Sequence, residues 1–322
     1  MARDARPLDG VLLFDKPLQL SSNTALQKVR RLFKAEKAGH TGTLDPLASG
    51  LLPICFGEAT KFSTGLLDAD KTYRALLKLG QTSTTGDAEG EITIIHAALP
   101  DEESVRAALL NFVGEIEQIP PMYSALKHQG KPLYEYIRKG ETIERAARRV
   151  TIHELVLEHF SGDEMEISVR CSKGTYVRTL AEDIGHGLGC GAHLRGLCRT
   201  AIAHFSLKKS YTLEQLEAMD MPEREACLLP LDCMLQDFPM FELDAVQVTR
   251  MAQGQRLGID AGLPDGKIRL YSAGKFIGVA ELLGRRLAPD RLLSSVAKSA
   301  AKIDRPPEIP VPSSSSQQTT EQ

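Results

Sequence analysis

The sequence predicts an α+β protein built from two domains. The chain has 322 residues, 42% of them hydrophobic, so it is long for one domain and can bury a sizeable core. Segments with the alternation of strands and segments with helical spacing follow one another up to the Pro-broken segment at Phe238-Pro239. Beyond it, one helical segment and two strands indicate a small β-rich module. We therefore expect a first domain at 1–238 and a second at 239–295.

Each element is predicted by its own pattern. Residues 164–171 show the clearest strand, because Met165, Ile167, Val169 and Cys171 alternate with polar residues. Strands are expected at 10–14, 71–80, 164–171, 267–272 and 275–282. Helices are expected from Ser21 or Ser22 to Phe33, at 105–113, from Leu180 to Leu188, at 212–219 and at 244–253.

Composition narrows the class of protein. The net charge of −3 gives no overall field that would attract nucleic acid, so any such binding must use local basic surfaces. The six cysteines form no C-x-x-C pair, which is typical of reduced thiols in a cytosolic protein. Trp is absent and aromatic residues make up 5% of the chain, so we expect one or two well-placed tyrosines rather than a surface rich in stacking side chains.

No segment has the pattern of a membrane anchor. No apolar run approaches the roughly 18 residues of a membrane span, and the charged first residues are not followed by the apolar stretch of a secretory signal. We therefore expect a cytoplasmic protein. The end of the chain is rich in Pro, Ser, Gln and Thr, and we expect residues 296–322 to form a disordered tail.

The most informative stretch is Gly39–Pro53, which combines three glycines and two prolines with one carboxylate, Asp45. Glycine and proline restrict or extend the backbone conformations of such a loop, which can hold a single acid in a defined pose. Asp45 followed by Pro46 is also a typical helix start, with Asp45 as the N-cap. A structural cap and a catalytic Asp45 are compatible, and we expect both.

Two basic segments are candidates for contacts with phosphate. The first follows a helix face and the residues after it, and includes Arg30, Arg31 and Lys34. The second is an irregular insertion at 119–150, where tyrosines are interleaved with basic residues that include Lys127, Lys131, Arg148 and Arg149. A solvated helix face is the ordinary explanation of the first, and a plain exposed insertion explains the second equally well. An RNA clamp is the functional alternative.

The glycine-rich segment at 185–193 is interpreted as a helix end and a turn. It lacks the Lys-Ser/Thr ending of a phosphate loop, so it does not indicate a nucleotide site. His186, Cys190, His193 and Cys198 do not have the spacing of a standard zinc finger. No metal is expected.

Motifs along the whole first domain resemble the TruB-type tRNA pseudouridine synthases. The catalytic motif of that family is similar to Gly39–Pro53 with the following Gly57–Phe62. The resemblance continues, in order, through Gly10–Pro17, Lys71–Arg74, Pro121–Lys127, Lys131–Tyr136, Cys171–Thr179 and Gly189–Leu194. The segment 239–295 resembles, more weakly, the PUA-like RNA-binding modules that follow this catalytic domain.

The resemblance implies a fold and a reaction. The fold is a mixed, mainly antiparallel central sheet flanked by helices, the pseudouridine synthase fold. The reaction converts uridine 55 in the T arm of tRNA to pseudouridine: the N1 glycosidic bond breaks, the uracil turns, and C5 joins C1′. No atoms enter or leave, so no cofactor is expected. The base must be flipped out of a structured loop, which costs a few kcal/mol.

The resemblance also assigns roles to single residues. Asp45 matches the nucleophile, Arg178 its ion-pair partner, and Tyr73 the residue that stacks on the base and accepts a proton. The remaining pocket residues are expected to be His40, Tyr176, Leu197, Lys16 and Lys61, with His40 supporting extrusion of the base. The Leu-Arg-Arg of the family is Leu197-Cys198-Arg199 here.

Two other functions fit the same basic segments. One is an RNA chaperone that reshapes tRNA, alone or in addition to catalysis. The other is the catalytic subunit of a guide-RNA particle, which the loop and the short end of the chain disfavour. We expect an enzyme that acts as a monomer on tRNA without guide RNA.

Overall fold

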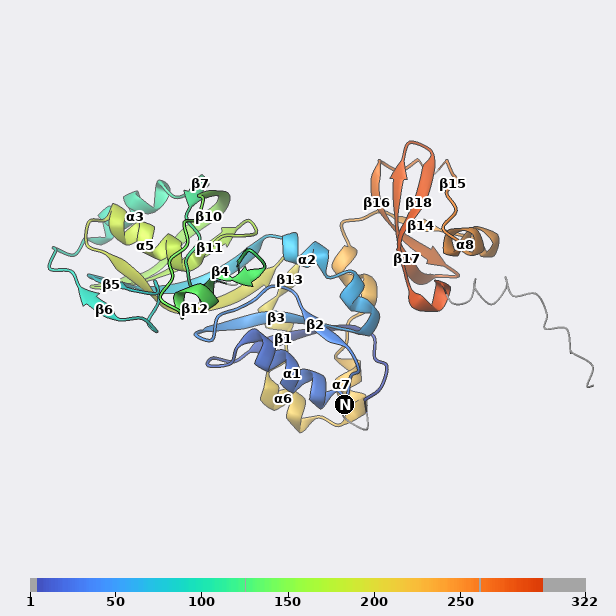
Figure 1. Cartoon of the computed structure of the whole chain (residues 1–322), viewed down its shortest axis with the longest axis horizontal. Helices are drawn as coiled ribbons and strands as arrows, with labels where there is room; N and C mark the ends of the chain where they lie inside the picture. Colours follow the sequence, from blue (N-terminus) through green and yellow to red (C-terminus); the bar gives the residue numbers. More distant parts are fainter. Residues whose placement is uncertain (1–4, 125, 261, 298–322) are drawn as a thin grey trace, which may run out of the picture. The chain divides into compact units, whose positions relative to one another are not determined.

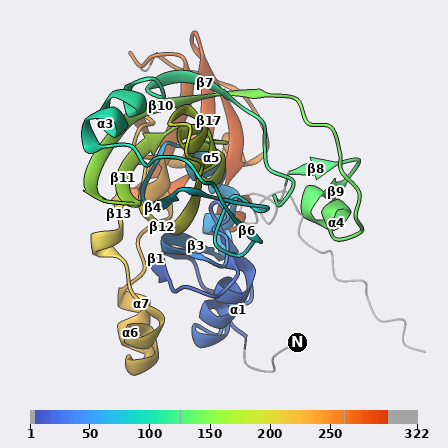
Figure 2. The ribbon, with the colours of Figure 1, turned by 90° about the vertical axis from the view of Figure 1, so that its left-hand side faces the viewer.

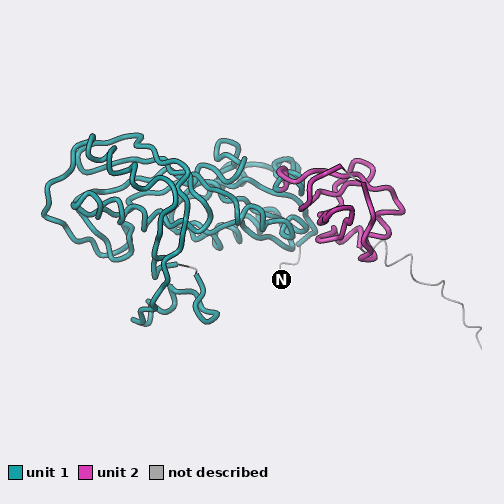
Figure 3. Tube along the Cα trace, turned by 90° about the horizontal axis from the view of Figure 1, so that it is seen from above, with its two compact units in different colours: residues 1–234 teal, residues 235–322 magenta. Residues whose placement is uncertain are grey.

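The computed structural model describes residues 5–124, 126–260 and 262–297. The chain forms two compact units, one up to Met234 and the other from Leu235 onward (Figure 3). The domain boundary expected from the sequence lies four residues further along, between 238 and 239. None of the helices in the described part is both long and apolar enough to cross a membrane.

The first unit is organised on one large sheet with the strand order β1-β3-β12-β4-β11-β10-β7 (Figure 1). Neighbouring strands are antiparallel except β3 and β12, which run parallel. The strands are β1 Gly10–Lys16, β2 Ala38–His40, β3 Ala48–Phe56, β4 Lys71–Leu79, β7 Gly114–Gln118, β10 Arg148–Ser161, β11 Glu164–Cys171, β12 Ala192–Ile202 and β13 Phe205–Ser206. The mixed, mainly antiparallel sheet that the resemblance implied is confirmed.

Helices and short elements complete this unit. The helices are α1 Ser22–Leu32, α2 Thr64–Asp68, α3 Glu102–Leu110, α4 Leu133–Ile137, α5 Val177–Gly187, α6 Leu213–Ala218 and α7 Met221–Ala226, with 3-10 turns η1 Gly57–Lys61, η2 Leu207–Lys209 and η3 Leu231–Leu235. The predicted cap of α1 is confirmed, because the Ser21 side chain accepts a hydrogen bond from the Thr24 N–H at 3.1 Å. The segment 185–193 forms the end of α5 and the turn into β12, as expected.

Two apolar cores cover the sheet. The first lies among β4, β11, β12, α3 and α5, and the second among β1, β3, α1 and α6. Figure 1 shows these helices beside the strands they cover. Tyr73 and Leu197 pack against both cores, so these two side chains lie where the cores meet.

The segment between β7 and β10 leaves the sheet. It contains β8 Lys127–His128, β9 Lys131–Pro132 and α4, which Figure 2 shows to one side of the strands. A second, shorter excursion forms the hairpin β5 Gln81–Ser83 and β6 Ile92–Ile94. The irregular insertion predicted at 119–150 is therefore present, and its last residues belong to β10.

The second unit is a five-stranded sheet with one main helix. Its elements are β14 Met240–Glu242, α8 Ala245–Ala252, β15 Leu257–Gly258, β16 Gly266–Ser272, β17 Lys275–Leu283 and β18 Arg286–Leu292. The predicted helix and both predicted strands are confirmed. The expected start of the disordered tail at 296 is wrong, because Val296 packs against the core of this unit. Residues 298–322 of the expected tail lie outside the described residues.

Candidate active site

Asp45 lies in a β-turn between β2 and β3. Its carbonyl oxygen accepts a hydrogen bond from the Ala48 N–H at 3.0 Å, and Pro46 occupies the second position of the turn. The expected helix start at Asp45-Pro46 is wrong: the chain enters β3 at Ala48 instead. Asp followed by Pro is equally typical of a β-turn, and the apolar run after the turn pairs with β1, which a helix would prevent.

The backbone before Asp45 is fixed from α1. The buried hydroxyl of Ser22 donates to the Leu44 carbonyl at 2.8 Å and accepts from the Leu44 N–H at 2.7 Å. One side chain thus satisfies both backbone groups of the residue adjacent to Asp45. The position of the carboxylate is therefore set by α1 as well as by the turn.

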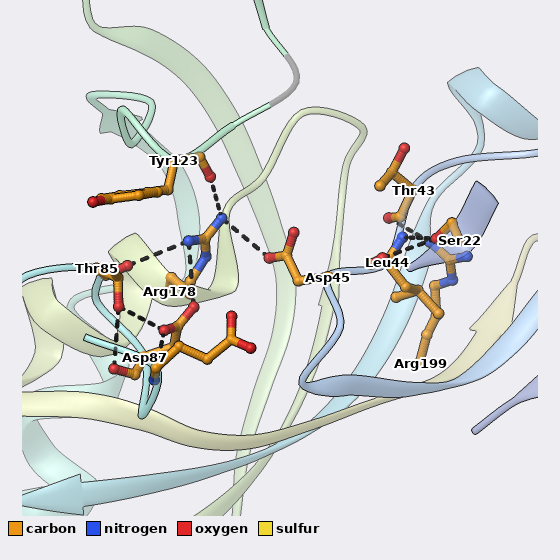
Figure 4. Close-up of polar contacts among 10 residues, drawn as sticks. Ser22, Thr43, Leu44, Asp45, Thr85, Asp87, Tyr123, Arg178 and Arg199 are labelled. Atoms are coloured by element: carbon orange, nitrogen blue, oxygen red, sulfur yellow. Dashed lines mark hydrogen bonds and ion pairs between the residues drawn. The ribbon is translucent and has the colours of Figure 1, made fainter. Parts of the chain in front are cut away.

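Arg178, in the first turn of α5, joins Asp45 to two other segments (Figure 4). Its side chain is 7% exposed, and its Nη2 lies 3.1 Å from Asp45 Oδ2. The same nitrogen donates to the Tyr123 carbonyl at 2.6 Å, at the beginning of the insertion. Nη1 lies 3.3 Å from Asp87 Oδ2 and donates to the Thr85 carbonyl at 3.3 Å. The predicted ion pair between Arg178 and Asp45 is present in the structure.

Asp87 is a further residue of the site, and no sequence pattern indicated it. It follows the β5 strand in a stretch that resembles an ordinary polar turn, yet its side chain is only 6% exposed. Its Oδ1 accepts from Thr85 Oγ1 at 2.6 Å and from the Glu89 N–H at 3.1 Å. No local pattern marks this carboxylate, because its burial comes from contact with β12 and Arg178.

The two carboxylates and the guanidinium set the protonation of the site. Burial raises the pKa of the Asp45 carboxyl above its usual range, the charge of Arg178 lowers it, and the charge of Asp87 raises it further. The Asp45 side chain is 44% exposed, so it remains accessible to a ligand. Asp45 is thus an accessible carboxylate whose ionised form is favoured by the charge of Arg178 and, to a smaller extent, by that of Lys16.

A shallow hollow that opens to solvent lies beside Asp45. Its polar lining comes from Asp45, Asp87, Arg178 and Arg195, and its apolar lining from Leu47, Ala48, Leu194, Gly196 and Leu197. Arg195, on β12, forms an ion pair with Glu164, the first residue of β11. The hollow combines an apolar wall with a few convergent charged groups, as ligand sites do.

Tyr73 and Leu197 occupy neighbouring strands under the site. Tyr73 lies on β4 opposite Arg199 of β12, and Leu197 of β12 lies between Ala48 of β3 and Ala75 of β4. Burial raises the pKa of the Tyr73 hydroxyl, and the neighbouring Arg199 opposes that rise. Leu197 lines the hollow, whereas Tyr73 lies at the junction of the cores beneath it.

The backbone of Tyr176 is held by Gln118, a residue that no sequence pattern marked. The buried amide of Gln118, the last residue of β7, accepts from the Tyr176 N–H at 3.0 Å and donates to the Tyr176 carbonyl at 3.2 Å. Tyr176 is the N-cap residue of α5, two residues before Arg178. Gln118 thereby fixes the start of α5 at the point where the insertion begins.

The other expected pocket residues, Lys16, His40 and Lys61, do not line the hollow, and they differ in burial. Lys16 is fully buried, and its Nζ donates to the carbonyls of Pro17 and Leu20 at 2.9 and 2.6 Å. Burial lowers the pKa of Lys16 to about 8, against the opposing effect of the Asp45 charge. His40 ends β2, and burial lowers its pKa. Lys61 in η1 forms an ion pair with Glu58 at 2.9 Å.

Most of the basic residues expected to contact RNA are exposed. These are Arg31, Lys34, Lys127, Lys131, Arg148 and Arg149. Arg30 is different, because it is half-buried and donates to the Ala35 carbonyl and to Gln27. Among the described residues, no group of three or more His, Cys, Asp or Glu side chains is placed to hold a metal ion.

Comparison with known families places this geometry in context. The profile of the TruB family pseudouridylate synthase N-terminal domain matches residues 30–177, and that of the tRNA pseudouridylate synthase B C-terminal domain matches 178–236. A third profile, pseudouridine synthase II TruB, C-terminal, matches residues 239–293. Together these matches span most of the chain.

Individual relatives agree with the profiles. The tRNA pseudouridine synthase B of Methylobacillus flagellatus is 57% identical over 293 residues, which cover 90% of this chain and 97% of the relative. That of Burkholderia mallei is 56% identical over 300 residues, which cover 91% of this chain and 99% of the relative.

Among solved structures, a Cbf5-Nop10-Gar1 complex has a TM-score of 0.68 at 23% identity, covering 88% of this chain and 84% of that one. An H/ACA RNP bound to a substrate RNA has a TM-score of 0.67 at 22% identity, with the same coverage. These two structures show the shared fold.

Proposed function

The chain belongs to the TruB family of pseudouridylate synthases, and on that premise we propose that it converts uridine 55 in the T arm of tRNA to pseudouridine. The relatives at 56–57% identity carry the name tRNA pseudouridine synthase B, which supports tRNA as the substrate. The proposal includes a monomeric, cytoplasmic enzyme that needs neither guide RNA nor a cofactor. An added role in folding tRNA would use the same basic surface.

The observation that carries the proposal is the ion pair of Asp45 with Arg178 at the edge of the hollow. An ionised carboxylate can act as a nucleophile. The 3.1 Å contact with Arg178 favours the ionised form against the burial and the charge of Asp87 that oppose it. Asp45 in this pose is the nucleophile of the proposed reaction.

The reaction needs the uracil to leave and rejoin the same sugar. Asp45 forms a bond to the nucleoside, the C1′–N1 bond breaks, and the base turns while it is retained in the pocket. C5 then bonds to C1′ and loses its proton, N1 takes up a proton, and the bond to Asp45 breaks, so no atom is gained or lost overall. Tyr73 is proposed to stack on the base and to accept the C5 proton. Leu197 forms an apolar wall of the hollow. Tyr176, Lys16 and Lys61 are proposed to complete the surroundings of the base.

The folded T arm is proposed to bind through its phosphates and its shape. Phosphate contacts are proposed for the cations on and just after α1, on the insertion and at the start of β10. These are the exposed Arg31, Lys34, Lys127, Lys131, Arg148 and Arg149, with the half-buried Arg30. His40 is proposed to occupy the place of the flipped base. The second unit is proposed to be a PUA-like module that binds another part of the tRNA.

The test is chemical mapping of pseudouridine in an unmodified tRNA transcript incubated with the protein alone. We expect conversion of uridine 55 without guide RNA, and complete loss of conversion in Asp45→Asn with retained tRNA binding. Asp68→Asn is the matched control, because it neutralises an exposed aspartate that pairs with Lys173. Turnover by Asp45→Asn, or modification only when a guide RNA is added, would contradict the proposal.

A further inference from the structure

Arg199 on β12 is a buried cation that the proposed mechanism does not use. It is 1% exposed, and among the residues that the structure describes no carboxylate forms an ion pair with it. Burial of a charge without an opposite charge is costly unless hydrogen bonds satisfy the group. The contacts of Arg199 therefore indicate why a cation is present there.

The guanidinium binds three backbone carbonyls on two sides of Asp45. Its Nη2 donates to the Gly42 carbonyl at 3.1 Å and its Nη1 contacts the Thr43 carbonyl at 3.5 Å, both in the loop that leads to Asp45. Its Nε donates to the Leu51 carbonyl at 2.8 Å, in the strand that follows the Asp45 turn. One planar group thus ties together the two chain segments that flank Asp45.

Arg199 also contacts Tyr73. The two residues are Cα partners across β12 and β4, and the Arg199 charge opposes the rise that burial causes in the pKa of the Tyr73 hydroxyl. On the other side of β12, Arg199 is paired with Gly50 of β3. Gly50 has a φ of +102°, and a Cβ there would overlap the Arg199 carbonyl oxygen. The glycine allows β3 and β12 to approach closely enough for the guanidinium to reach the loop.

The stability of the fold alone does not explain a cation at position 199, where an apolar side chain would avoid repulsion between charges. The Arg199 charge lowers the pKa of three neighbouring cationic groups, those of Lys16, His40 and Lys71. Replacement of a buried ion by an apolar side chain of similar size is often neutral or stabilising. Arg199 repels neighbouring cations, and its hydrogen bonds go to backbone carbonyls. Its contacts therefore indicate that it positions the backbone.

We propose that Arg199 is a positioning residue that holds the Asp45 loop and the Tyr73 hydroxyl in their reactive arrangement. Arg178 contacts the Asp45 carboxylate, whereas Arg199 contacts the backbone that carries it; Figure 4 shows the two arginines on opposite sides of Asp45. The inference rests on the proposed roles of Asp45 and Tyr73. Lysine cannot replace this function, because a compact ammonium group cannot span the three carbonyls of Gly42, Thr43 and Leu51 as the guanidinium does.

The test compares Arg199→Lys and Arg199→Met with a matched pair at Arg224. Arg224 also donates through its guanidinium to three carbonyls, those of Leu216, Leu32 and Glu217, but none of them belongs to the Asp45 loop. For both Arg199 variants we expect a single-turnover rate of pseudouridine formation lower by about 100-fold, the size of effect that a small misplacement of a reacting group produces. The Kd for tRNA should remain unchanged. Arg224→Lys and Arg224→Met should retain the wild-type rate.

Amide hydrogen exchange separates positioning from general loss of stability. We expect faster exchange at 41–45 in Arg199→Lys, with the amides of α5 and β11 unchanged. A wild-type rate in Arg199→Lys, equal losses in the Arg224 pair, or faster exchange throughout the first unit would overturn the inference. It would also be overturned if both Arg199 variants fail to fold while the Arg224 variants fold. If wild type forms no pseudouridine, or Asp45→Asn retains turnover, the proposed function fails instead.

Discussion

The two sides of Asp45 are built from different interactions. On the side of Arg178, charges meet: one guanidinium lies 3.1 Å from Asp45 and 3.3 Å from the buried Asp87. On the other side, the Ser22 hydroxyl and the Arg199 guanidinium bind neutral backbone groups of Gly42, Thr43 and Leu44. Charge on the first side controls the protonation of the carboxylate, and hydrogen bonds on the second side control its position.

A nucleophilic carboxylate must be ionised and must be correctly positioned, and the two sides of Asp45 supply these properties separately. The ionised form of Asp45 is set by groups that respond to pH and salt, whereas its backbone is fixed by contacts that respond to neither. Changes on the first side should therefore alter the pH dependence of the reaction, and changes on the second side should alter its rate at every pH. The variants below test this difference, from the largest expected effect to the smallest.

Removal of the guanidinium in Arg178→Met should have the largest effect. It leaves the 6% exposed side chain of Asp87 as an uncompensated charge and removes the partner of Asp45. We expect loss of detectable pseudouridine formation and a free energy of unfolding lower by about 3–5 kcal/mol, as when one partner of a buried ion pair is removed. Chemical denaturation and tRNA modification assays measure the two effects. Near-normal turnover would show that the charged side of the site is dispensable.

Truncation of the hydroxyl in Ser22→Ala tests the side on which hydrogen bonds hold the backbone. The Leu44 N–H and carbonyl both lose their partner, which costs about 1–3 kcal/mol for a buried polar group left unsatisfied. We expect a lower single-turnover rate by the same factor across the whole pH range. Ser210→Ala is the control, since the Ser210 hydroxyl donates to the Leu207 carbonyl outside this loop. A shift of the pH profile without loss of rate would contradict the division.

Neutralisation of the second carboxylate in Asp87→Asn should move the pH profile. The charge of Asp87 raises the pKa of Asp45, so its removal lets that pKa fall, and the ionised nucleophile persists to lower pH. The amide keeps an oxygen that accepts from Thr85 Oγ1 and the Glu89 N–H. We expect the acid limb of the single-turnover rate against pH to shift to lower pH. A shift to higher pH, or none, would exclude Asp45 as the group that titrates.

The insertion differs from both sides of the site, because its cations lie at the surface. Arg148→Ala removes one exposed charge at the start of β10. We expect weaker tRNA binding, with the slope of log K against log salt reduced by about 1 for the loss of one phosphate contact. The single-turnover rate at saturating protein should be unchanged. Arg106→Ala is the control, since Arg106 pairs with Glu102 on α3. An equal change of slope in both variants would remove Arg148 from the RNA surface.

The fold was largely predictable because its elements have local signals. The alternation in 71–79 and 164–171, the Ser21 cap and the spacing of Leu26 and Val29 depend on neighbouring residues only. The Asp45-Pro46 step was predicted incorrectly for a related reason. The same two residues favour a helix start and a β-turn, and the choice between them depends on the pairing of β3 with β1, which lies far away in the sequence.

The sequence by itself determined the family, the α+β class with its β-rich second unit, and Asp45, Tyr73 and Arg178 as candidates, because motifs and periodicities are local. Only the tertiary structure decided that Arg178 also binds Asp87, that Ser22 supports Leu44, and that Arg199 joins Gly42, Leu51 and Tyr73. These contacts link residues that lie between 22 and 157 positions apart. An ordinary serine, aspartate or arginine becomes part of the site only when the sheet buries it beside Asp45.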